Sequence, residues 1–264
     1  MSFLSHKQRQ SFFKEGFLVL ESFFSKQQTG LIREIHSKLW TEKPNGLIID
    51  DLNTGLRNEI SDIPEDRKKN RFKYSDLYLI YDEVRKLLTC NKTICGILKE
   101  LMIDEPVLCN TLNLDYGSSQ PMHVDALYMK PRSPYNLLAV WIALEDVHKE
   151  AGPLFYVPQS HLFEQYTFSN GDTKAIDDEM PKWNHFIQNQ IDLWNLNKKN
   201  FYAKEGDIFI WHAYLCHGGA KIVDHELTRK SMVCHYFIKS DAEAFFPVIK
   251  DEHGFWLKKP FLSA

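Results

Sequence analysis

The chain has 264 residues, a length that fits one large domain or two small ones. Its 44% hydrophobic and 25% charged residues are those of an ordinary globular protein, and a net charge of −3 excludes the basic excess of a nucleic-acid-binding protein. No apolar run approaches the ~18 residues of a membrane helix. No linker or internal repeat is visible, so we expect a single domain over residues 1–264.

Location and assembly are weakly constrained by the sequence. The N-terminal residues have mixed charge and lack the apolar stretch of a signal peptide. The five cysteines form no C-x-x-C pair, which disfavours both a zinc ribbon and a disulfide framework. We therefore expect a cytoplasmic monomer or homodimer whose partner is a small-molecule substrate, with no nucleic-acid or membrane contact.

Helical patterns dominate the first part of the chain, about residues 1–104. Residues 17–20 (FLVL) predict a short strand, and the polar, charge-rich residues 43–75 predict a loop. The predicted helices are residues 6–16, preceded by the capping residue Ser5, residues 25–41, and most of residues 76–104.

Strand patterns follow over about residues 105–240. Residues 136–144 (NLLAVWIAL) are continuously apolar, as in a strand buried on both faces. A polar, partly helical insertion at about residues 164–200 interrupts the series. Strands without alternating helices favour an antiparallel sandwich or barrel, so the predicted fold is mainly β with flanking α-helices. The predicted strands are residues 106–114, 136–144, 152–157, 201–203, 207–212 and 230–238.

Residues 121–128 (PMHVDALY) carry a histidine and an aspartate two positions apart. With 11 His and 35 acidic residues, chance gives about 11 × 35/264, or roughly 1.5, such triplets, and the chain has two. The second, His148 to Glu150, lies in a polar turn and is expected to be solvated. On a strand, residues two apart point the same way, so His123 and Asp125 could reach one point.

A metal site needs a third ligand, which residues 205–219 supply as His217, with His212 as a rival. Two imidazoles and one carboxylate on one face form the facial triad of non-haem Fe(II) oxygenases. The open coordination positions can take a bidentate 2-oxo acid and O2. Zinc accepts the same ligands, so the triad alone does not identify the metal.

Arg229 and Ser231 lie on one face of the last long strand, and Arg229 comes twelve residues after His217. A guanidinium fork beside a hydroxyl suits a carboxylate, because charge-assisted bonds fix its orientation. A dicarboxylate such as 2-oxoglutarate could chelate iron at one end and bind Arg229 at the other. The alternative for a lone arginine is a surface ion pair.

In this order the segments resemble the phytanoyl-CoA dioxygenase family of Fe(II)/2-oxoglutarate oxygenases, which includes ectoine hydroxylases. The resemblance covers most of the chain, and its strength lies in the order of the pieces rather than in any one of them. The matching segments are residues 13–24 (FKEGFLVLESFF), 122–128 (MHVDALY), 139–146 (AVWIALED), 151–161 (AGPLFYVPQSH), 204–207 (KEGD), His217 and residues 229–231 (RKS).

The resemblance implies a double-stranded β-helix, the cupin-like jelly roll, and an iron centre. It implies that His123, Asp125 and His217 are the catalytic Fe(II) ligands. It also implies that the distal carboxylate of 2-oxoglutarate lies on Arg229 and Ser231. Two further positions are candidates for contact with the co-substrate: Trp141, whose alternative is a plain core aromatic, and Asn113, if it faces the sheet interior.

Two positions depart from the family pattern. A third position, Asp125, retains the family residue and indicates the type of reaction. Many members carry Gln where this chain has Val124, and the Gly of one signature is Gln159 here. Family halogenases place a small residue at the position of Asp125, so the retained carboxylate favours hydroxylation, with desaturation as the alternative. The expected reaction consumes O2 and releases succinate and CO2.

The substrate is expected to be a small polar metabolite, such as an amino acid or a phosphonate-like compound. Lys130 and Arg132 would suit an anionic substrate, although solvated surface charge is their alternative role. Residues 164–200 could act as a lid. The candidate substrate contacts are Tyr128, Lys130, Arg132, Trp211, Tyr214 and His235.

Two other classes of protein remain open. One is a non-catalytic cupin-like small-molecule-binding protein, against which the complete triad and Arg229 argue. The other is a zinc-dependent hydrolase on a β scaffold, which would have no need of Arg229.

Overall fold

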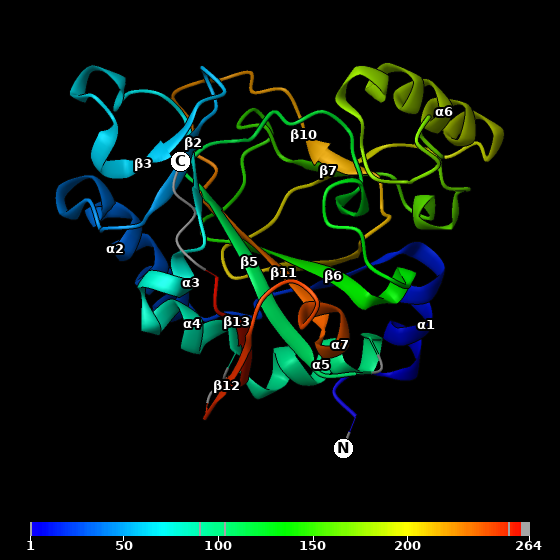
Figure 1. Ribbon diagram of the computed structural model, residues 1–264, viewed down its shortest axis with the longest axis horizontal. Coiled ribbons are helices and arrows are strands. Elements are labelled where there is room, and N and C mark those ends of the chain that lie inside the picture. The colour runs from blue at the N-terminus through cyan, green and yellow to red at the C-terminus, as the bar shows by residue number, and fades with distance from the viewer. Residues whose placement is uncertain (1, 90, 103, 253, 260–264) are drawn as a thin grey trace.

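The computed structural model describes residues 2–89, 91–102, 104–252 and 254–259 (Figure 1). Helices precede the long strands, and two further helices follow later in the chain. The helices are α1 (His6–Glu15), α2 (Lys26–Glu42), α3 (Leu77–Ile80), α4 (Asp82–Thr89), α5 (Lys92–Met102), α6 (Met180–Leu193) and α7 (Lys239–Ala242).

The first two α-helices begin as their sequences predict. Ser5 and Gln8 form a reciprocal capping box at the start of α1, and Ser25 and Gln28 form another at the start of α2. Gly16 ends α1 with a left-handed φ of 82°, a conformation that glycine adopts without strain. Both predicted helices are confirmed.

The strands form two separate sheets. Ten strands make the larger one, in the order β1-β9-β6-β11-β5-β4-β2-β3, with β13 joining β5 and β12 pairing with β13. The smaller sheet has the order β10-β7-β8. The strands are β1 (Phe17–Leu20), β2 (Ile48–Asp51), β3 (Arg57–Glu59), β4 (Phe72–Ser75), β5 (Pro106–Leu114), β6 (Leu137–Ala143), β7 (Leu154–Tyr156), β8 (Lys199–Phe201), β9 (Ile208–His212), β10 (His217–Gly219), β11 (Ser231–Ile238), β12 (Val248–Asp251) and β13 (Gly254–Leu257).

The central strands of the larger sheet are buried on both faces. Val140 and Ile142 of β6 point outward, into a core shared with helices α1–α5. Trp141, between them, points inward, where it clusters with Trp211 of β9 and Tyr156 of β7. In Figure 1, α3, α4 and α5 lie on one side of β5 and β11, and β7 and β10 lie on the other. Successive residues of a strand point to opposite faces of the sheet. Because both faces of these strands are buried, every position must be apolar, which gives a continuous apolar run.

Two mainly antiparallel sheets that face each other across an aromatic core make the expected jelly roll, here with helices on the outer face. The predicted fold class is therefore confirmed. Within the part of the chain that the structure describes, no helix has the length and apolar character needed to cross a membrane.

Residues 43–75 are not the loop that their composition predicts. Strands β2, β3 and β4 come from this segment, and β4 pairs with β5, which extends the larger sheet by three strands. The partner of β4 lies about forty residues away in the sequence, and local polarity does not report such a pairing. A smaller difference concerns the strand predicted at residues 201–203, which is found earlier, at Lys199–Phe201.

Candidate metal and co-substrate site

The two segments that carry the candidate ligands His123 and His217 are joined directly by backbone hydrogen bonds. The His123 amide donates to the His217 carbonyl at 2.9 Å, and the His217 amide donates to the His123 carbonyl at 3.0 Å. Val124 is extended, but Asp125 begins a 3-10 turn (Asp125–Leu127) rather than continuing a strand. The shared direction of His123 and Asp125 thus comes from a strand-like bridge followed by a turn.

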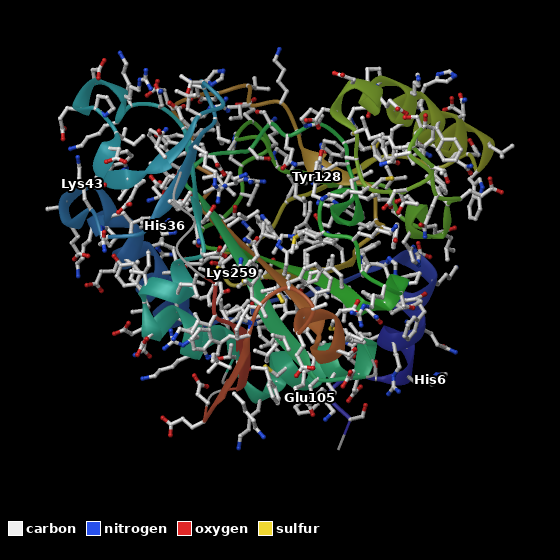
Figure 2. All side chains as sticks on the ribbon, in the orientation of Figure 1. His6, His36, Lys43, Glu105, Tyr128 and Lys259 are labelled. Atoms are coloured by element: carbon white, nitrogen blue, oxygen red, sulfur yellow. The ribbon has the colours of Figure 1, made fainter. Side chains whose placement is uncertain are left out.

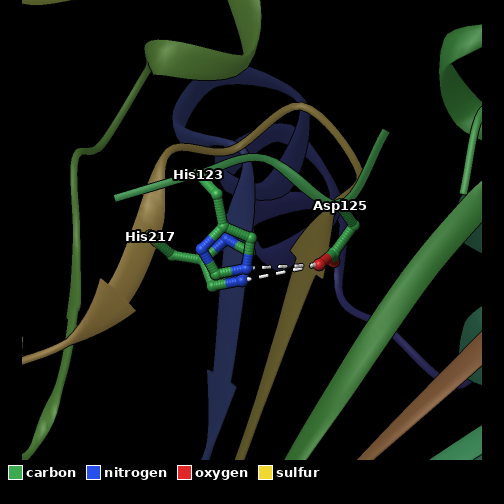
Figure 3. A group of neighbouring side chains, drawn as sticks. All are labelled: His123, Asp125 and His217. Carbon is green, nitrogen blue, oxygen red and sulfur yellow. Dashed lines mark ion pairs between the residues drawn. The ribbon is translucent and has the colours of Figure 1, made fainter. Parts of the chain in front are cut away.

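The three side chains converge on one point, as Figure 3 shows. The distance from Asp125 Oδ1 is 3.9 Å to His123 Nε2 and 3.6 Å to His217 Nε2. One ligand atom from each residue lies within 4.8 Å of the other two, and all three residues are buried. Because metal–N and metal–O bonds are about 2.1 Å, atoms up to about 4.2 Å apart can share one ion, and both distances from Asp125 Oδ1 lie within this limit. The donor set therefore fits a single divalent metal.

Backbone carbonyls fix both imidazole rings. His123 Nδ1 lies 2.9 Å from the Pro121 carbonyl oxygen, and His217 Nδ1 lies 2.9 Å from the Leu215 carbonyl oxygen. A carbonyl only accepts hydrogen bonds, so each Nδ1 carries the proton and each Nε2 keeps its lone pair for a ligand bond. The rings are set in the tautomer that metal binding needs.

The ionisation states also suit a metal site. Burial, and next the proximity of His217, lower the pKa of His123 to about 4, so this imidazole is neutral at neutral pH. Burial on its own would raise the pKa of Asp125, but His217, His235 and His123 around it bring it well below its usual value. A neutral imidazole and an ionised carboxylate are the forms that bind metal.

The second oxygen of Asp125 is occupied by two residues of the larger sheet. Trp211 Nε1 donates a hydrogen bond of 2.7 Å to Asp125 Oδ2, and His235 Nε2 lies 3.6 Å from the same atom. Gln120 places its amide nitrogen 3.2 Å from His123 Nε2. Sequence reasoning missed Gln120, which has no motif signal, and proposed Trp211 and His235 only as substrate contacts.

The ligands open on a cavity of about 280 Å³ that also reaches Arg229 and Trp141. Arg229 is buried, and no ion pair among the described residues involves it. Its guanidinium makes a long hydrogen bond of 3.4 Å, from Nη2 to Ser231 Oγ. Burial lowers the pKa of Arg229 to about 10, which leaves it charged at neutral pH. The Arg229 guanidinium carbon lies 5.7 Å from the Trp141 ring centre, and Trp141 Nε1 has no partner among the described residues. A buried unpaired cation is costly, so the geometry calls for an anion here.

Asn113 lies on the opposite face of β5 from this cavity. Its strand neighbours Leu112 and Leu114 line the cavity, whereas Asn113 pairs with Met232, which belongs to the outer core. Its amide is buried, and neither amide atom has a hydrogen-bond partner among the described residues. This position argues against the predicted contact with the co-substrate.

Most of the other substrate candidates lie outside the cavity wall. Tyr128 is 52% exposed, with its ring 6.0 Å from that of His123, on the side of the molecule that carries β7 and β10 (Figure 2). Lys130 pairs with Asp172, and Arg132 pairs with Asp241. Tyr214 and His212 pack against each other outside the cavity wall, with ring centres 5.8 Å apart. The group of converging ligand atoms contains His217 and not the rival His212.

Comparison with known proteins gives matches along most of the chain. A family model described as phytanoyl-CoA dioxygenase matches residues 12–223. The peroxisomal phytanoyl-CoA dioxygenase of Mus musculus is 26% identical over 258 residues, which cover 88% of this chain and 68% of the mouse protein.

Solved structures of low sequence identity share the fold. The alpha ketoglutarate-dependent epimerase SnoN from nogalamycin biosynthesis has a TM-score of 0.65 at 19% identity, covering 88% of this chain and 82% of its own. SnoN has also been solved with Fe3+, alpha ketoglutarate and nogalamycin RO. EctD from S. alaskensis, with 2-oxoglutarate and 5-hydroxyectoine, has a TM-score of 0.63 at 15% identity, covering 91% of this chain and 78% of its own.

Proposed function

The chain belongs to the phytanoyl-CoA dioxygenase family of non-haem Fe(II)/2-oxoglutarate-dependent oxygenases, and on this premise we propose that it hydroxylates a small polar metabolite. The observation that carries the proposal is one cavity that joins three convergent ligand atoms to a buried, unpaired guanidinium. The cofactors are Fe(II), 2-oxoglutarate and O2.

Three residues would hold the iron. We assign Nε2 of His123, Nε2 of His217 and Oδ1 of Asp125 as its ligands. These three atoms face one another, and the Nδ1 atom of each imidazole ring is held by a backbone carbonyl. Trp211 occupies the other carboxylate oxygen and so favours binding through Oδ1 alone. Three protein ligands leave the rest of the coordination sphere to co-substrate and O2.

The co-substrate would lie between the iron and Arg229. A carboxylate on Arg229 would neutralise the buried guanidinium and accept from it, with the Ser231 hydroxyl beside it as a further donor. Trp141 Nε1 is a donor without a partner near the same place, which fits a contact with the co-substrate. When bound, iron with 2-oxoglutarate and O2 supplies oxidative decarboxylation to succinate and CO2, with one oxygen atom going to a substrate C–H bond.

The protein's own contribution is position and exclusion of water. Trp211 and Trp141 wall the cavity with buried aromatic surface, so the reacting groups meet in a low-dielectric space. The cavity of about 280 Å³ is close to the lower end of the roughly 300–1,000 Å³ that small-molecule sites span. Since 2-oxoglutarate must share it, the part of the substrate that enters is small.

The two rival classes of protein differ from this proposal in different ways. A zinc hydrolase uses the triad but gains nothing from a buried, unpaired cation in the same cavity. A non-catalytic binding protein would not consume 2-oxoglutarate. Succinate formation in air, screened over a library of small polar metabolites with purified Fe(II)-loaded protein, tests the proposal. Succinate that forms only when substrate is present, and that no longer forms in His217→Ala, supports the proposal. The proposal is contradicted if no library member causes 2-oxoglutarate to be consumed.

A further inference from the structure

Another cavity, of about 320 Å³, lies on the outer face of the larger sheet. Residues of α2, of β4 and of the segments that follow β5 and precede β11 line this outer cavity, among them His36, Trp40, Phe72, Tyr74, Asp115 and Lys230. We propose that the outer cavity binds a small aromatic carboxylate, at a site distinct from those of iron and 2-oxoglutarate. The inference goes beyond the proposed function and does not depend on turnover.

The sheet separates the outer cavity from the cavity that reaches the candidate metal ligands. Leu114 lines the metal-site cavity, and its neighbour Asp115 lines the outer one. Arg229 and Lys230 are divided in the same way, as expected where adjacent residues point to opposite faces of a sheet. The Arg229 amide donates a 2.8 Å hydrogen bond to the Asp115 carbonyl, which joins the two segments. A ligand of the outer cavity therefore lies behind Arg229, across the sheet from the position proposed for the co-substrate.

Aromatic rings supply the apolar part of the outer cavity. The ring centre of Trp40 lies 5.0 Å from that of Phe72, and the ring centre of His36 lies 5.7 Å from that of Tyr74. Trp40 Nε1 donates a 3.1 Å hydrogen bond to the Tyr74 hydroxyl, which fixes the orientation of the indole. Aromatic side chains favour offset or edge-to-face contact with another ring, so these residues suit an aromatic ligand.

Lysine side chains give the outer cavity a surplus of positive charge. Lys230 is half-buried, and no ion pair among the described residues involves its ammonium. Lys68 lies 2.6 Å from Glu65, a carboxylate that it shares with Lys43 at 3.7 Å. Of the charged lining residues, Lys68 and Lys230 stand against the single carboxylate of Asp115, which leaves a formal charge of +1. The uncompensated ammonium of Lys230 is therefore the group suited to the carboxylate of a ligand.

A buried imidazole in the lining has hydrogen-bonding capacity that the chain does not use. His36, labelled in Figure 2, belongs to α2 and is 6% exposed. Its Nδ1 lies 3.4 Å from Asp115 Oδ1, and neither ring nitrogen has a hydrogen-bond partner among the described residues. Burial on its own would raise the pKa of Asp115, but His36 and next Lys230 bring it below its usual value. Buried polar groups are normally hydrogen-bonded, so the unpartnered imidazole is a second sign of a ligand site.

These features together define the class of ligand. A purely apolar molecule would leave Lys230 without a counter-charge, and an inorganic anion would leave the aromatic rings uncovered. A carboxylate on Lys230 with its ring against Trp40 satisfies both. The volume of about 320 Å³ lies within the roughly 300–1,000 Å³ of small-molecule sites, so the ligand is small.

The test uses benzoate as probe, titrated by calorimetry into the metal-free full chain. Benzamide, which has the ring without the charge, and acetate, which has the charge without the ring, are the control ligands. We expect benzoate to bind more tightly than either control. Lys230→Met should weaken benzoate binding about tenfold, Lys230→Arg should restore most of it, and Asp115→Asn should tighten it about threefold, because a like charge is removed. The matched control is Lys149→Met, at an exposed lysine between β6 and β7, and it should bind benzoate as wild type does.

A second titration locates the site. Benzoate affinity should persist in Arg229→Met, and in wild type loaded anaerobically with Fe(II) and saturating 2-oxoglutarate. The inference is overturned if benzoate does not bind wild type, if benzamide binds as tightly, if Lys230→Met binds benzoate unchanged, or if 2-oxoglutarate displaces benzoate. Thermal unfolding of Lys230→Met reports whether that variant folds. If no Fe(II)–2-oxoglutarate complex forms, the proposed function fails, and the titrations of metal-free protein still decide this inference.

Discussion

Trp211 Nε1 donates a 2.7 Å hydrogen bond to Asp125 Oδ2, and both side chains are buried. The contact occupies one carboxylate oxygen and leaves Oδ1 facing His123 and His217. With both imidazole rings fixed by backbone carbonyls, all three proposed ligand groups are oriented by the protein itself. The site is preorganised by side chains that belong to the core of the jelly roll.

Replacement of Trp211 by Phe is therefore expected to weaken metal binding by about 10- to 100-fold, because Asp125 loses the partner that orients it. Anaerobic Fe(II) titration against a competing chelator measures this. Trp183→Phe is the matched control, a buried tryptophan of α6 outside the cavity wall. Equal affinities for the two variants would show that the Trp211 contact does not position the ligand.

Arg229→Met should separate co-substrate affinity from stability. Loss of the guanidinium is expected to raise the Kd of 2-oxoglutarate by at least about 30-fold, equivalent to about 2 kcal/mol. The Tm of the ligand-free protein should not fall, because a buried unpaired cation is removed. The control is Arg132→Met, which removes an exposed arginine outside the cavity wall. Unchanged 2-oxoglutarate affinity in Arg229→Met would remove Arg229 from the site.

Two asparagines of β5 should respond oppositely to valine. Asn113 has no partner for its buried amide among the described residues, so Asn113→Val is expected to raise the free energy of unfolding by about 1 kcal/mol and leave 2-oxoglutarate affinity unchanged. Asn110 contacts His235 and donates to Asp76, so Asn110→Val should destabilise by about 1–3 kcal/mol. Urea denaturation measures both. Weaker 2-oxoglutarate binding in Asn113→Val would contradict its outward placement.

Stability should fall with acidity partly through His212. Burial, and next the proximity of His161, lower the pKa of His212 to about 3 in the folded protein, against about 6.5 when unfolded. Between these values the unfolded state binds more protons, so this contribution is full above pH 6.5 and declines as the pH falls toward 3. At pH 5 the loss is about 1.5 × 1.36, or roughly 2 kcal/mol.

His212→Asn keeps a hydrogen-bond acceptor near the position of Nδ1, which accepts from the Tyr214 amide. Its free energy of unfolding should therefore drop less between pH 7 and pH 5 than that of wild type. Urea denaturation at the two pH values gives the difference between the proteins. Parallel pH profiles would mean that His212 is not neutral in the folded state.

Local patterns predicted the elements whose signals lie within a few residues. The capping boxes at Ser5 and Ser25 and the apolar run of β6 gave helices and strands close to their observed bounds. Strands β2 and β4 were missed because β4 pairs with the distant strand β5 and β2 pairs in turn with β4, and no local composition reports such pairing.

The candidate site was predictable where its residues belong to a sequence motif. It was less predictable where the prediction depended on which face of a strand points into the cavity. The sequence grouped His123, Asp125 and His217, and the structure brings them together. Alternation fixed which residues of β5 share a face, but both faces are buried, so polarity could not say which one lines the cavity. The structure places Asn113 on the other face from the one expected. Lys73 of β4, which lines the cavity, was not proposed because its segment was predicted as loop.

The central claim, that this cavity binds iron and 2-oxoglutarate together, is tested most directly by anaerobic titration of the metal-free protein with Fe(II) and then 2-oxoglutarate. The account predicts a weak visible metal-to-ligand charge-transfer band that saturates at one equivalent of iron, is absent in His123→Ala, and requires much more 2-oxoglutarate in Arg229→Met. A wild-type protein that binds Fe(II) but gives no band at saturating 2-oxoglutarate, or a band that survives in His123→Ala, would contradict it.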